Sequence, residues 1–285
     1  MRFLEDPLTR GRDLDDPRTT ELRRQIVRNK PFLRQVYEDW YATIVNALPP
    51  GRGLVLELGS GAGFLDQRLP DLITSDVFPL RGLSLALDAR SLPFGRGCLR
   101  AVVMTDVLHH LPDCRRFFRE AARCVRDGGR IVMVEPWVTP WSRLVYGRLH
   151  HEPFLPESVD WAFPSSGPLS GANGALPWIL FSRDRALFER DFREWRIRSI
   201  QPTMPFRYLL SGGVSMRSLA PAWAYGILQR MEALLSPLNG YLAMFAVIVL
   251  ERAGGRPGAP GVDPSPEHAA IAAVPADRGA SGVPR

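Results

Sequence analysis

Lysine, cysteine and long apolar runs are scarce in this chain of 285 residues, and each shortage excludes a class of protein. Lys30 is the only lysine, so nearly all of the 36 basic residues are arginines. No five of them are consecutive, and they are spread along the chain among acidic residues, so the net charge of +6 indicates a solvated surface. Because a nucleic-acid partner requires a basic stripe with interleaved aromatic residues, we expect no nucleic-acid binding.

The cysteines exclude a disulfide framework. Only Cys98, Cys114 and Cys124 occur, an odd number without a CxxC pair or a spacing typical of metal ligands. Free thiols in a reducing compartment are the expectation.

No segment of the sequence reads as a membrane span. The longest apolar run, residues 242–250, has nine residues and fits a buried strand rather than a bilayer-crossing helix. The first residues lack the apolar segment of a secretory signal. We therefore expect a cytoplasmic protein without a transmembrane segment.

What the sequence does contain is an alternation of helices and short apolar strands. Residues 20–48 predict two helices separated at Pro31, with an apolar stripe at every fourth residue. Further helices are predicted at 64–69, 113–128 and 183–192, and strands at 53–58, 72–76, 83–87, 101–105, 131–134, 195–200 and 242–250. Strands that are apolar throughout indicate a parallel sheet covered on both faces, so the fold class is α/β.

The same pattern divides the chain into segments. Residues 1–48 are predicted as an N-terminal arm and helical cap, and residues 49–251 as the α/β domain. Two insertions, 137–181 and 203–240, interrupt this domain, and the first is rich in Trp, Pro, Gly and Ser. Residues 252–285 are predicted as a disordered tail, because they offer little apolar surface to bury.

A glycine-rich turn follows the first predicted strand in the stretch LELGSGAGFL. The spacing is G-x-G-x-G at Gly59, Gly61 and Gly63, with Glu57 two residues before the first glycine. Glycines let the backbone pass close to a ligand. The lysine of a phosphate-binding P-loop is absent. The turn therefore predicts a nucleotide site of another kind.

Two aspartates follow the next two predicted strands. Asp76 ends the second strand, where a carboxylate can accept hydrogen bonds from both ribose hydroxyls. Asp88 follows the third strand, where it can accept from the amine of adenine. Each alone is equally consistent with a turn or a cap. With the glycine turn, at the carboxyl ends of successive strands, they predict an adenosine pocket.

The ordered series resembles class I S-adenosylmethionine-dependent methyltransferases, in the broad group that acts on small molecules, lipids and sugars. The resemblance covers residues 52–136 and rests on LELGSGAGFL, Asp76, LDARSLPF, VVMTDVLHHLPD and FFREAARCVRDGGRIVMVEP. It implies a Rossmann-like, doubly wound, seven-stranded sheet whose last strand is antiparallel. Strands 195–200 and 242–250 would form the closing hairpin.

The resemblance also implies S-adenosylmethionine as cofactor and a role for each matching residue. Glu57 would orient the methionine portion, and Thr105 would lie near the sulfonium. Asp76 would bind the ribose, and Asp88 and Ala89 the adenine. The backbone of the turn would line the methionine and ribose, through Gly59, Ser60, Gly61 and Gly63.

His109 and His110 are the candidates for a general base. They follow the fourth strand in a string that resembles bacterial sugar and natural-product O-methyltransferases, where a histidine here is a proposed base. A neutral imidazole can accept a proton near pH 7. The alternative is that both histidines only pack and bond to backbone, as in relatives that act on carbon or nitrogen. We expect His110 to be the better candidate.

The first insertion contains the polar string His150-His151-Glu152. A metal site would need a third ligand on a rigid element, so none is predicted. We expect His151 and Glu152 to contact the substrate, the alternative being a surface loop. An apolar wall around the acceptor is expected from Trp137, Trp141, Tyr146 and Phe154, the alternative being that they only pack the insertion onto the sheet. In the second insertion, the helical stripe of residues 223–234 is interpreted as core or cap, and peripheral membrane contact is left open.

The sequence thus predicts a bacterial methyltransferase whose acceptor is a small molecule or a glycan- or lipid-linked precursor, most simply through a hydroxyl oxygen. Three alternatives stay open: a carbon or nitrogen acceptor, an NAD(P)-dependent oxidoreductase, and a non-catalytic binding protein. The acceptor and the oligomeric state do not follow from the sequence.

Overall fold

The computed structural model describes residues 6–13, 15–149, 152–164, 167, 169 and 171–254. From residue 255 on, the predicted tail lies outside the described residues, as does His151.

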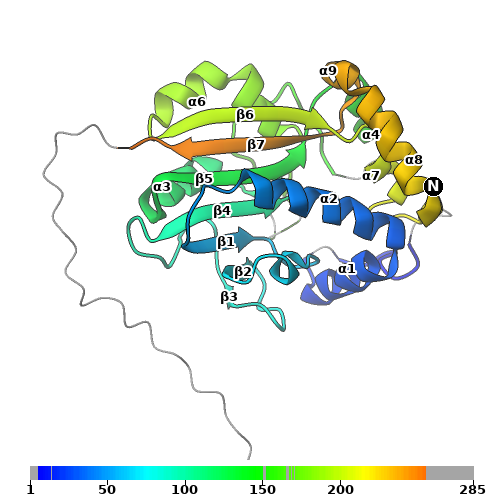
Figure 1. Ribbon diagram of the computed structural model, residues 1–285, viewed down its shortest axis with the longest axis horizontal. Helices are drawn as coiled ribbons and strands as arrows, with labels where there is room; N and C mark the ends of the chain where they lie inside the picture. Colours follow the sequence, from blue (N-terminus) through cyan, green and yellow to red (C-terminus); the bar gives the residue numbers. More distant parts are fainter. Residues whose placement is uncertain are drawn as a thin grey trace, which may run out of the picture. The chain divides into compact units, whose positions relative to one another are not determined.

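Within the described chain, one seven-stranded sheet organises the fold (Figure 1). Its order is β3-β2-β1-β4-β5-β7-β6. The five strands from β3 to β5 are parallel, and β7 is antiparallel to both of its neighbours. The predicted doubly wound sheet with an antiparallel last strand is confirmed. The strands are β1 (Leu54–Leu58), β2 (Leu72–Asp76), β3 (Leu85–Ala86), β4 (Leu99–Thr105), β5 (Val125–Pro136), β6 (Trp195–Thr203) and β7 (Phe245–Arg252).

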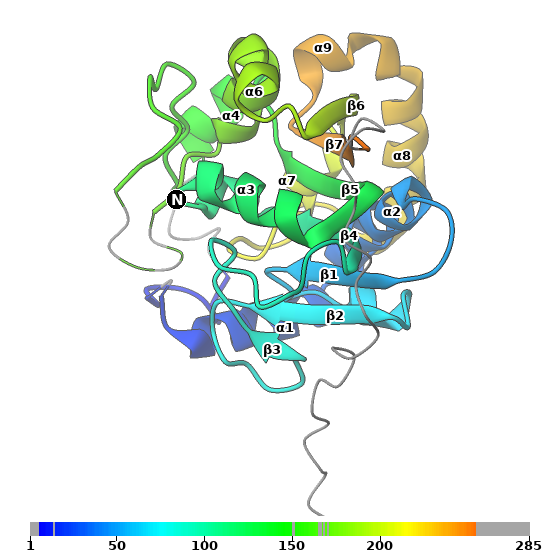
Figure 2. The same cartoon turned by 90° about the vertical axis from the view of Figure 1, so that its left-hand side faces the viewer.

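Alternate residues of the central strands enter two separate cores, one on each face of the sheet. On β4, Val102 and Met104 join the core under α3 (Cys114–Cys124) and α6 (Arg185–Asp191). Ala101 and Val103 join the opposite core, which contains α1 (Pro17–Asn29), α2 (Pro31–Ala47) and α8 (Tyr225–Leu234). Figure 2 shows α3 and α6 on one side of the sheet and α2 and α8 on the other. Both faces are therefore covered, as the continuous apolar strands predicted.

The two N-terminal helices form as predicted and separate at Lys30. Asp16 caps α1 by accepting from the backbone N–H of Arg18, and proline stands at the start of both helices. The buried residues of α2 repeat at the predicted spacing.

Two local predictions are wrong. The helix predicted at 64–69 is only a 3-10 turn, Leu65–Gln67. The helix predicted to stop at Gly128 and Gly129 ends at Cys124, because the chain from Val125 onward already pairs with β4. A Cβ on Gly129 would lie 2.7 Å from the carbonyl oxygen of Arg100, so glycine serves strand packing here rather than a helix stop.

The insertions are more regular than their composition suggests. The first contains α4 (Pro140–Leu149), α5 (Leu176–Trp178) and a π-helical turn (Ile179–Arg183). Thr139 and Ser142 cap α4 reciprocally, each backbone N–H donating to the other's hydroxyl. The second contains α7 (Arg207–Ser211), α8 and α9 (Asn239–Leu242).

The interpretation of residues 223–234 as a core stripe is also wrong. Trp223, Ile227 and Leu234 are exposed by 76%, 61% and 83%. The buried side of α8 carries Tyr225 and Glu232 instead. Helical spacing defined a stripe correctly, but the side that packs inward carries Glu232, which is paired with Arg207.

Candidate functional site

The glycine turn after β1 is held against β2. The backbone N–H of Ser60 donates to the carbonyl of Ser75, and that of Gly61 donates to Oδ2 of Asp76. Gly59 has a positive φ of 68°. A Cβ on Gly59 would lie 2.4 Å from Cγ2 of Val107, and one on Gly61 would lie 2.7 Å from Oδ2 of Asp76. Glycine is required because the neighbouring elements approach the bare backbone.

We expect Gly59→Ala to lower the free energy of unfolding more than Gly82→Ala does. Both glycines have a positive φ, but a Cβ on Gly82 would meet nothing within 4 Å. Alanine should cost about 1–2 kcal/mol at either position for the left-handed backbone. At Gly59 the contact with Val107 should add about 1–3 kcal/mol. Urea unfolding measures both, and equal losses would refute a steric role for the turn.

Helix α1 is tied to the same turn. Nε of Arg24 donates to the carbonyl of Gly61 at 2.7 Å, and its Nη1 donates to the carbonyl of Arg81 at 2.9 Å. The N-terminal helices thus belong to the site.

Three predicted acids lie at the carboxyl ends of the strands, each in a different setting. Glu57 is buried and accepts from the hydroxyl of Ser60 at 2.6 Å. Asp76 accepts from the backbone N–H groups of Gly61 and Phe78. The more exposed Asp88 is paired with Arg90 at 2.7 Å.

Burial is the largest influence on the pKa values of Glu57 and Asp76. It raises the pKa of Glu57 to about 7, against the opposing hydrogen bond from Ser60. It also raises the pKa of Asp76, although backbone N–H groups favour its ionised form. The hydrogen bond from Arg90 instead lowers the pKa of Asp88. Buried carboxyl groups of this kind are stabilised in their charged form by a cationic ligand.

A cavity of about 580 Å³ opens over these residues. Ten of the predicted site residues line it: Glu57, Gly59, Gly61, Gly63, Asp76, Asp88, Ala89, Thr105, His110 and Glu152. Ser60 lies behind Glu57 and His109 lies behind His110, both buried. Trp137 and Trp141 do not line the cavity. Trp137 packs in a core, and Nε1 of Trp141 donates to the carbonyl of Pro205.

Six aromatic residues surround the cavity. They come from the N-terminal helices, both insertions and β7: Tyr37, Tyr41, Tyr146, Phe154, Tyr208 and Phe245. Tyr146 and Phe154 stack with ring centroids 4.7 Å apart. Tyr146 and Phe154 are two of the four residues expected to form the apolar wall, and both line the cavity.

Two buried threonine hydroxyls are suited to a polar ligand. Oγ1 of Thr20 and Oγ1 of Thr105 have no hydrogen-bond partner among the described residues, and both residues line the cavity. Buried polar atoms without a partner are costly and rare, so a bound molecule with polar groups would satisfy them.

A charged cluster lies at one side of the cavity, around the 3-10 turn Leu108–His110 that follows β4. Glu135, fully buried at the end of β5, accepts from the backbone N–H groups of Val107 and Leu108 and contacts Nδ1 of His109 at 2.8 Å. Sequence reasoning missed Glu135. It is an acid at the carboxyl end of a strand, the same signal that identified Asp76.

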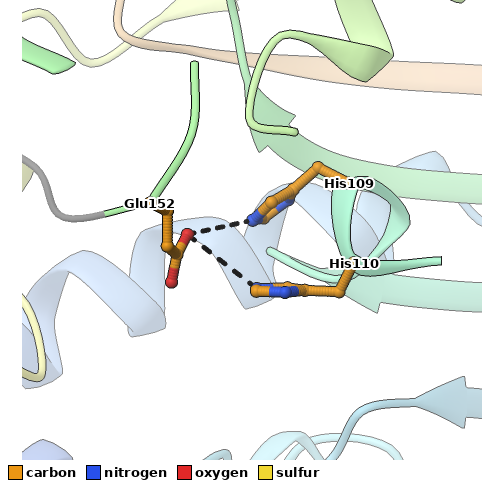
Figure 3. A group of neighbouring side chains, drawn as sticks. All are labelled: His109, His110 and Glu152. Carbon is orange, nitrogen blue, oxygen red and sulfur yellow. Dashed lines mark ion pairs between the residues drawn. The ribbon is translucent and has the colours of Figure 1, made fainter. Parts of the chain in front are cut away.

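Glu152 joins this cluster from the first insertion (Figure 3). Its Oε2 lies 3.6 Å from Nε2 of His109 and 4.0 Å from Nε2 of His110, so both rings point toward one carboxylate. Nδ1 of His110 lies 3.4 Å from the carbonyl oxygen of Gly171. The ligand-type atoms of this trio lie within 4.8 Å of one another. The sequence showed no further ligand for a cation beside the string that contains Glu152. In the structure, His109 and His110 of the 3-10 turn after β4 are such neighbours.

The two histidines differ in protonation. Burial alone would favour neutral His109, but its contacts with Glu135 and Glu152 raise its pKa well above the ordinary value. Burial, together with the charge on His109, lowers the pKa of His110 to about 3. At neutral pH the cavity therefore faces an unprotonated His110, with a protonated His109 behind it.

Asp106 also faces the cavity and was not predicted. It takes a positive φ of 62°, which is uncommon for a residue other than glycine, and its carboxylate lies 4.0 Å from Nε2 of His109. Backbone conformations of this type are concentrated at functional sites.

Comparison with known proteins agrees with the glycine turn and the acids. Residues 56–133 match the family model described as "Methyltransferase domain". A curated relative, the polyketide synthase-nonribosomal peptide synthetase TwmB of Talaromyces wortmannii, is 26% identical over 102 residues. That match covers 35% of this chain but only 3% of the relative's length.

Solved structures resemble the chain at low identity. The geranyl diphosphate C-methyltransferase of Streptomyces coelicolor A3(2) is 12% identical, with a TM-score of 0.49 over 88% of this chain and 89% of that one. The YcgJ protein of Bacillus subtilis is 16% identical, with a TM-score of 0.43 over 75% and 97%. At these scores the similarity identifies neither a shared acceptor nor a shared activity.

Proposed function

The chain contains a class I S-adenosylmethionine-dependent methyltransferase domain, and from this premise we propose that it methylates a small-molecule acceptor bound in the described cavity. One observation supports the proposal most. A single cavity joins the glycine turn and the strand-end acids to an aromatic pocket that ends at His110 and Glu152. Donor and acceptor would therefore meet in one enclosed space.

The residues present suit the cofactor. Asp76 would accept from the ribose hydroxyls, and Asp88 and Ala89 would meet the adenine. Glu57 would pair with the amino group of the methionine portion, for which a buried carboxylate is well suited. The unpartnered hydroxyls of Thr20 and Thr105 add polar contacts. The bare glycine backbone leaves the space that a Cβ would fill.

A hydroxyl oxygen is the acceptor we propose, on a small molecule or a glycan- or lipid-linked precursor. Bound S-adenosylmethionine would supply a methyl group on a positively charged sulfur. The acceptor oxygen would bond to that methyl carbon, and the electron pair of the broken carbon–sulfur bond would stay on the sulfur of S-adenosylhomocysteine. The hydroxyl proton must leave during this step. Unprotonated His110 would take it on Nε2, where Glu152, 4.0 Å away, stabilises the resulting positive charge.

A carbon acceptor is the second candidate. The pKa of about 3 makes His110 a weak base, whereas carboxylates beside aromatic rings can stabilise positive charge that develops on carbon. Glu152, Tyr146 and Phe154 provide that combination in the cavity. Nuclear magnetic resonance of a product carrying a ¹³C-methyl group distinguishes the two, since oxygen- and carbon-bound methyl carbons have well separated shifts.

Cofactor binding is tested most directly at Asp76. Asp76→Ala should weaken binding of S-adenosylhomocysteine by about 1–3 kcal/mol, because the ribose donors lose their acceptor. Asp71→Ala, which removes an exposed acid at the start of the same strand, is the matched control. Isothermal calorimetry with parallel unfolding curves measures both. Wild-type affinity in Asp76→Ala would contradict the assignment, and binding of NADH instead would support an oxidoreductase.

The predicted domain boundaries and the expectation of a bacterial, cytoplasmic enzyme stay predictions.

A further inference from the structure

An exposed apolar strip runs along the second insertion. We define it by the seven residues Leu219, Trp223, Ile227, Met231, Leu234, Leu238 and Tyr241, which are exposed by 36% to 83%. It follows α8 and continues to α9, which lie next to each other in Figure 1. Exposed large apolar residues that occur singly need no explanation, but a contiguous set indicates an interaction surface.

The strip is presented on a fixed element. Ile227 and Leu234 share one side of α8, and the exposed Trp223 precedes them in the 3-10 turn Ala222–Ala224, whereas Tyr225 and Glu232 on the other side of α8 are buried. Glu232 accepts from Nε of Arg207 at 2.6 Å and from the backbone of Phe206 and Arg207. The inner side of α8 is therefore firmly docked, and the strip faces away from the protein.

The charges around the strip have one sign. Between residues 203 and 240, Glu232 is the only acid, and it is 5% exposed and paired with Arg207. Arg230 is exposed and, by helical spacing, stands between Ile227 and Leu234 on the apolar side. Arg217 is exposed in the preceding loop. Residues 203–240 thus combine apolar and aromatic side chains with positive charge and offer no exposed carboxylate of their own.

We propose that this strip is a docking surface for an anionic lipid bilayer. Helices that lie in a membrane interface combine an apolar face with basic residues, and tryptophan and tyrosine favour the headgroup level. Arginine can extend its charged group to lipid phosphates while its stem stays among apolar neighbours. A second copy of the chain fits less well, because symmetric pairing would bring two Arg230 side chains together without an acid to neutralise them.

The same insertion also reaches the cavity, through Tyr208, Val214 and Ser215. Resting on the proposed function, we infer that the acceptor is itself membrane-embedded or lipid-linked and enters from the bilayer surface. No helix among the residues that the structure describes has the length and apolar composition to cross a membrane.

Vesicle co-sedimentation of the full chain tests the proposal. Wild type should bind vesicles of phosphatidylcholine with phosphatidylglycerol and bind less to phosphatidylcholine alone. Leu234→Ser and Trp223→Ser should each lower the partition constant by about tenfold. The matched control is Val159→Ser, which removes an apolar side chain of equal exposure, 87% against 83% for Leu234, outside the strip. Arg230→Gln should reduce the preference for anionic vesicles.

Three results would overturn the proposal. The wild type could fail to sediment with either vesicle, or Leu234→Ser could bind vesicles as the wild type does. The third result is a wild-type dimer in sedimentation velocity that Leu234→Ser converts to a monomer. Calorimetry with S-adenosylhomocysteine on the same samples distinguishes a failure of the membrane-docking proposal from a failure of the proposed methyltransferase function. All four variants should bind it as wild type does. Failure of wild type to bind it would count against the proposed function while leaving the vesicle result intact.

Discussion

Replacing His110 with alanine should lower kcat by about 10²-fold, the lower end of the usual contribution of a general base, because a pKa of about 3 makes His110 a weak base. Binding of S-adenosylhomocysteine should stay close to wild type, because the contacts of His110 are with Glu152, His109 and Gly171 and not with the strand-end acids. Single-turnover kinetics and calorimetry measure the two effects. Near-wild-type kcat in His110→Ala, together with a large loss in Glu152→Gln, would transfer the role to the carboxylate and favour a carbon acceptor.

The pH profile provides a second test of the same residue. From sequence alone, one expects a rate that rises through an ionisation near the ordinary histidine pKa of about 6.5. In the structure, burial lowers the pKa of His110 to about 3, so its base form is fully present from pH 5 upward. We expect His110 to contribute no rise in kcat between pH 5 and 8. Dialysis against a chelator should leave kcat unchanged, since the proposed step uses no metal.

Glu57→Gln should produce a protein that is more stable than wild type at pH 8. Burial raises the pKa of Glu57 from 4.5 to about 7 in the folded chain. For an acid shifted in this direction, the folded state holds the proton more tightly than the unfolded state does. Its contribution to stability is present in full below pH 4.5 and is lost as the pH rises through 7. A pKa shift of this size corresponds to a loss of about 3 kcal/mol of folding stability above pH 7. Glutamine carries no charge at any pH and largely avoids that loss.

The same substitution should weaken cofactor binding. An amide can accept a hydrogen bond from the cofactor's amino group but supplies no negative charge, a loss of about 1.5–3 kcal/mol. Wild-type affinity should rise between pH 5 and 8 as Glu57 ionises, and Glu57→Gln should lack that rise. Glu21→Gln, at an exposed acid, is the control for both measurements. A less stable Glu57→Gln with unchanged affinity would contradict both parts.

The cofactor half of the cavity could be located from sequence because its residues follow strand ends directly. Once the strands were identified, Glu57, Asp76 and Asp88 had to meet at one edge of a parallel sheet. The structure places them there, on the lining of one cavity. Their roles in binding stay predictions. Glu135 obeys the same rule and could have been found with it.

The acceptor half could not be located in this way, because its residues come together only through long-range packing. Tyr37 and Tyr208 reach the cavity from segments about 170 residues apart in a chain of 285. Conversely, Trp137 and Trp141 stand beside the predicted rim in sequence but turn into the protein interior. Helical spacing in α8 could define two sides but not which side packs, since the buried side carries Glu232 and the exposed side carries Trp223.

The division of the cavity lining also affects how such a protein can diversify. The turn and the acids come from one continuous stretch, residues 57–89, whereas Tyr37, Tyr146, Phe154 and Tyr208 come from separate helices and insertions. Substitutions or length changes in the insertions that carry Tyr146, Phe154 and Tyr208 leave the backbone hydrogen bonds between the turn and β2 untouched. Lineages could therefore exchange one acceptor for another by remodelling peripheral segments while inheriting the donor site unchanged.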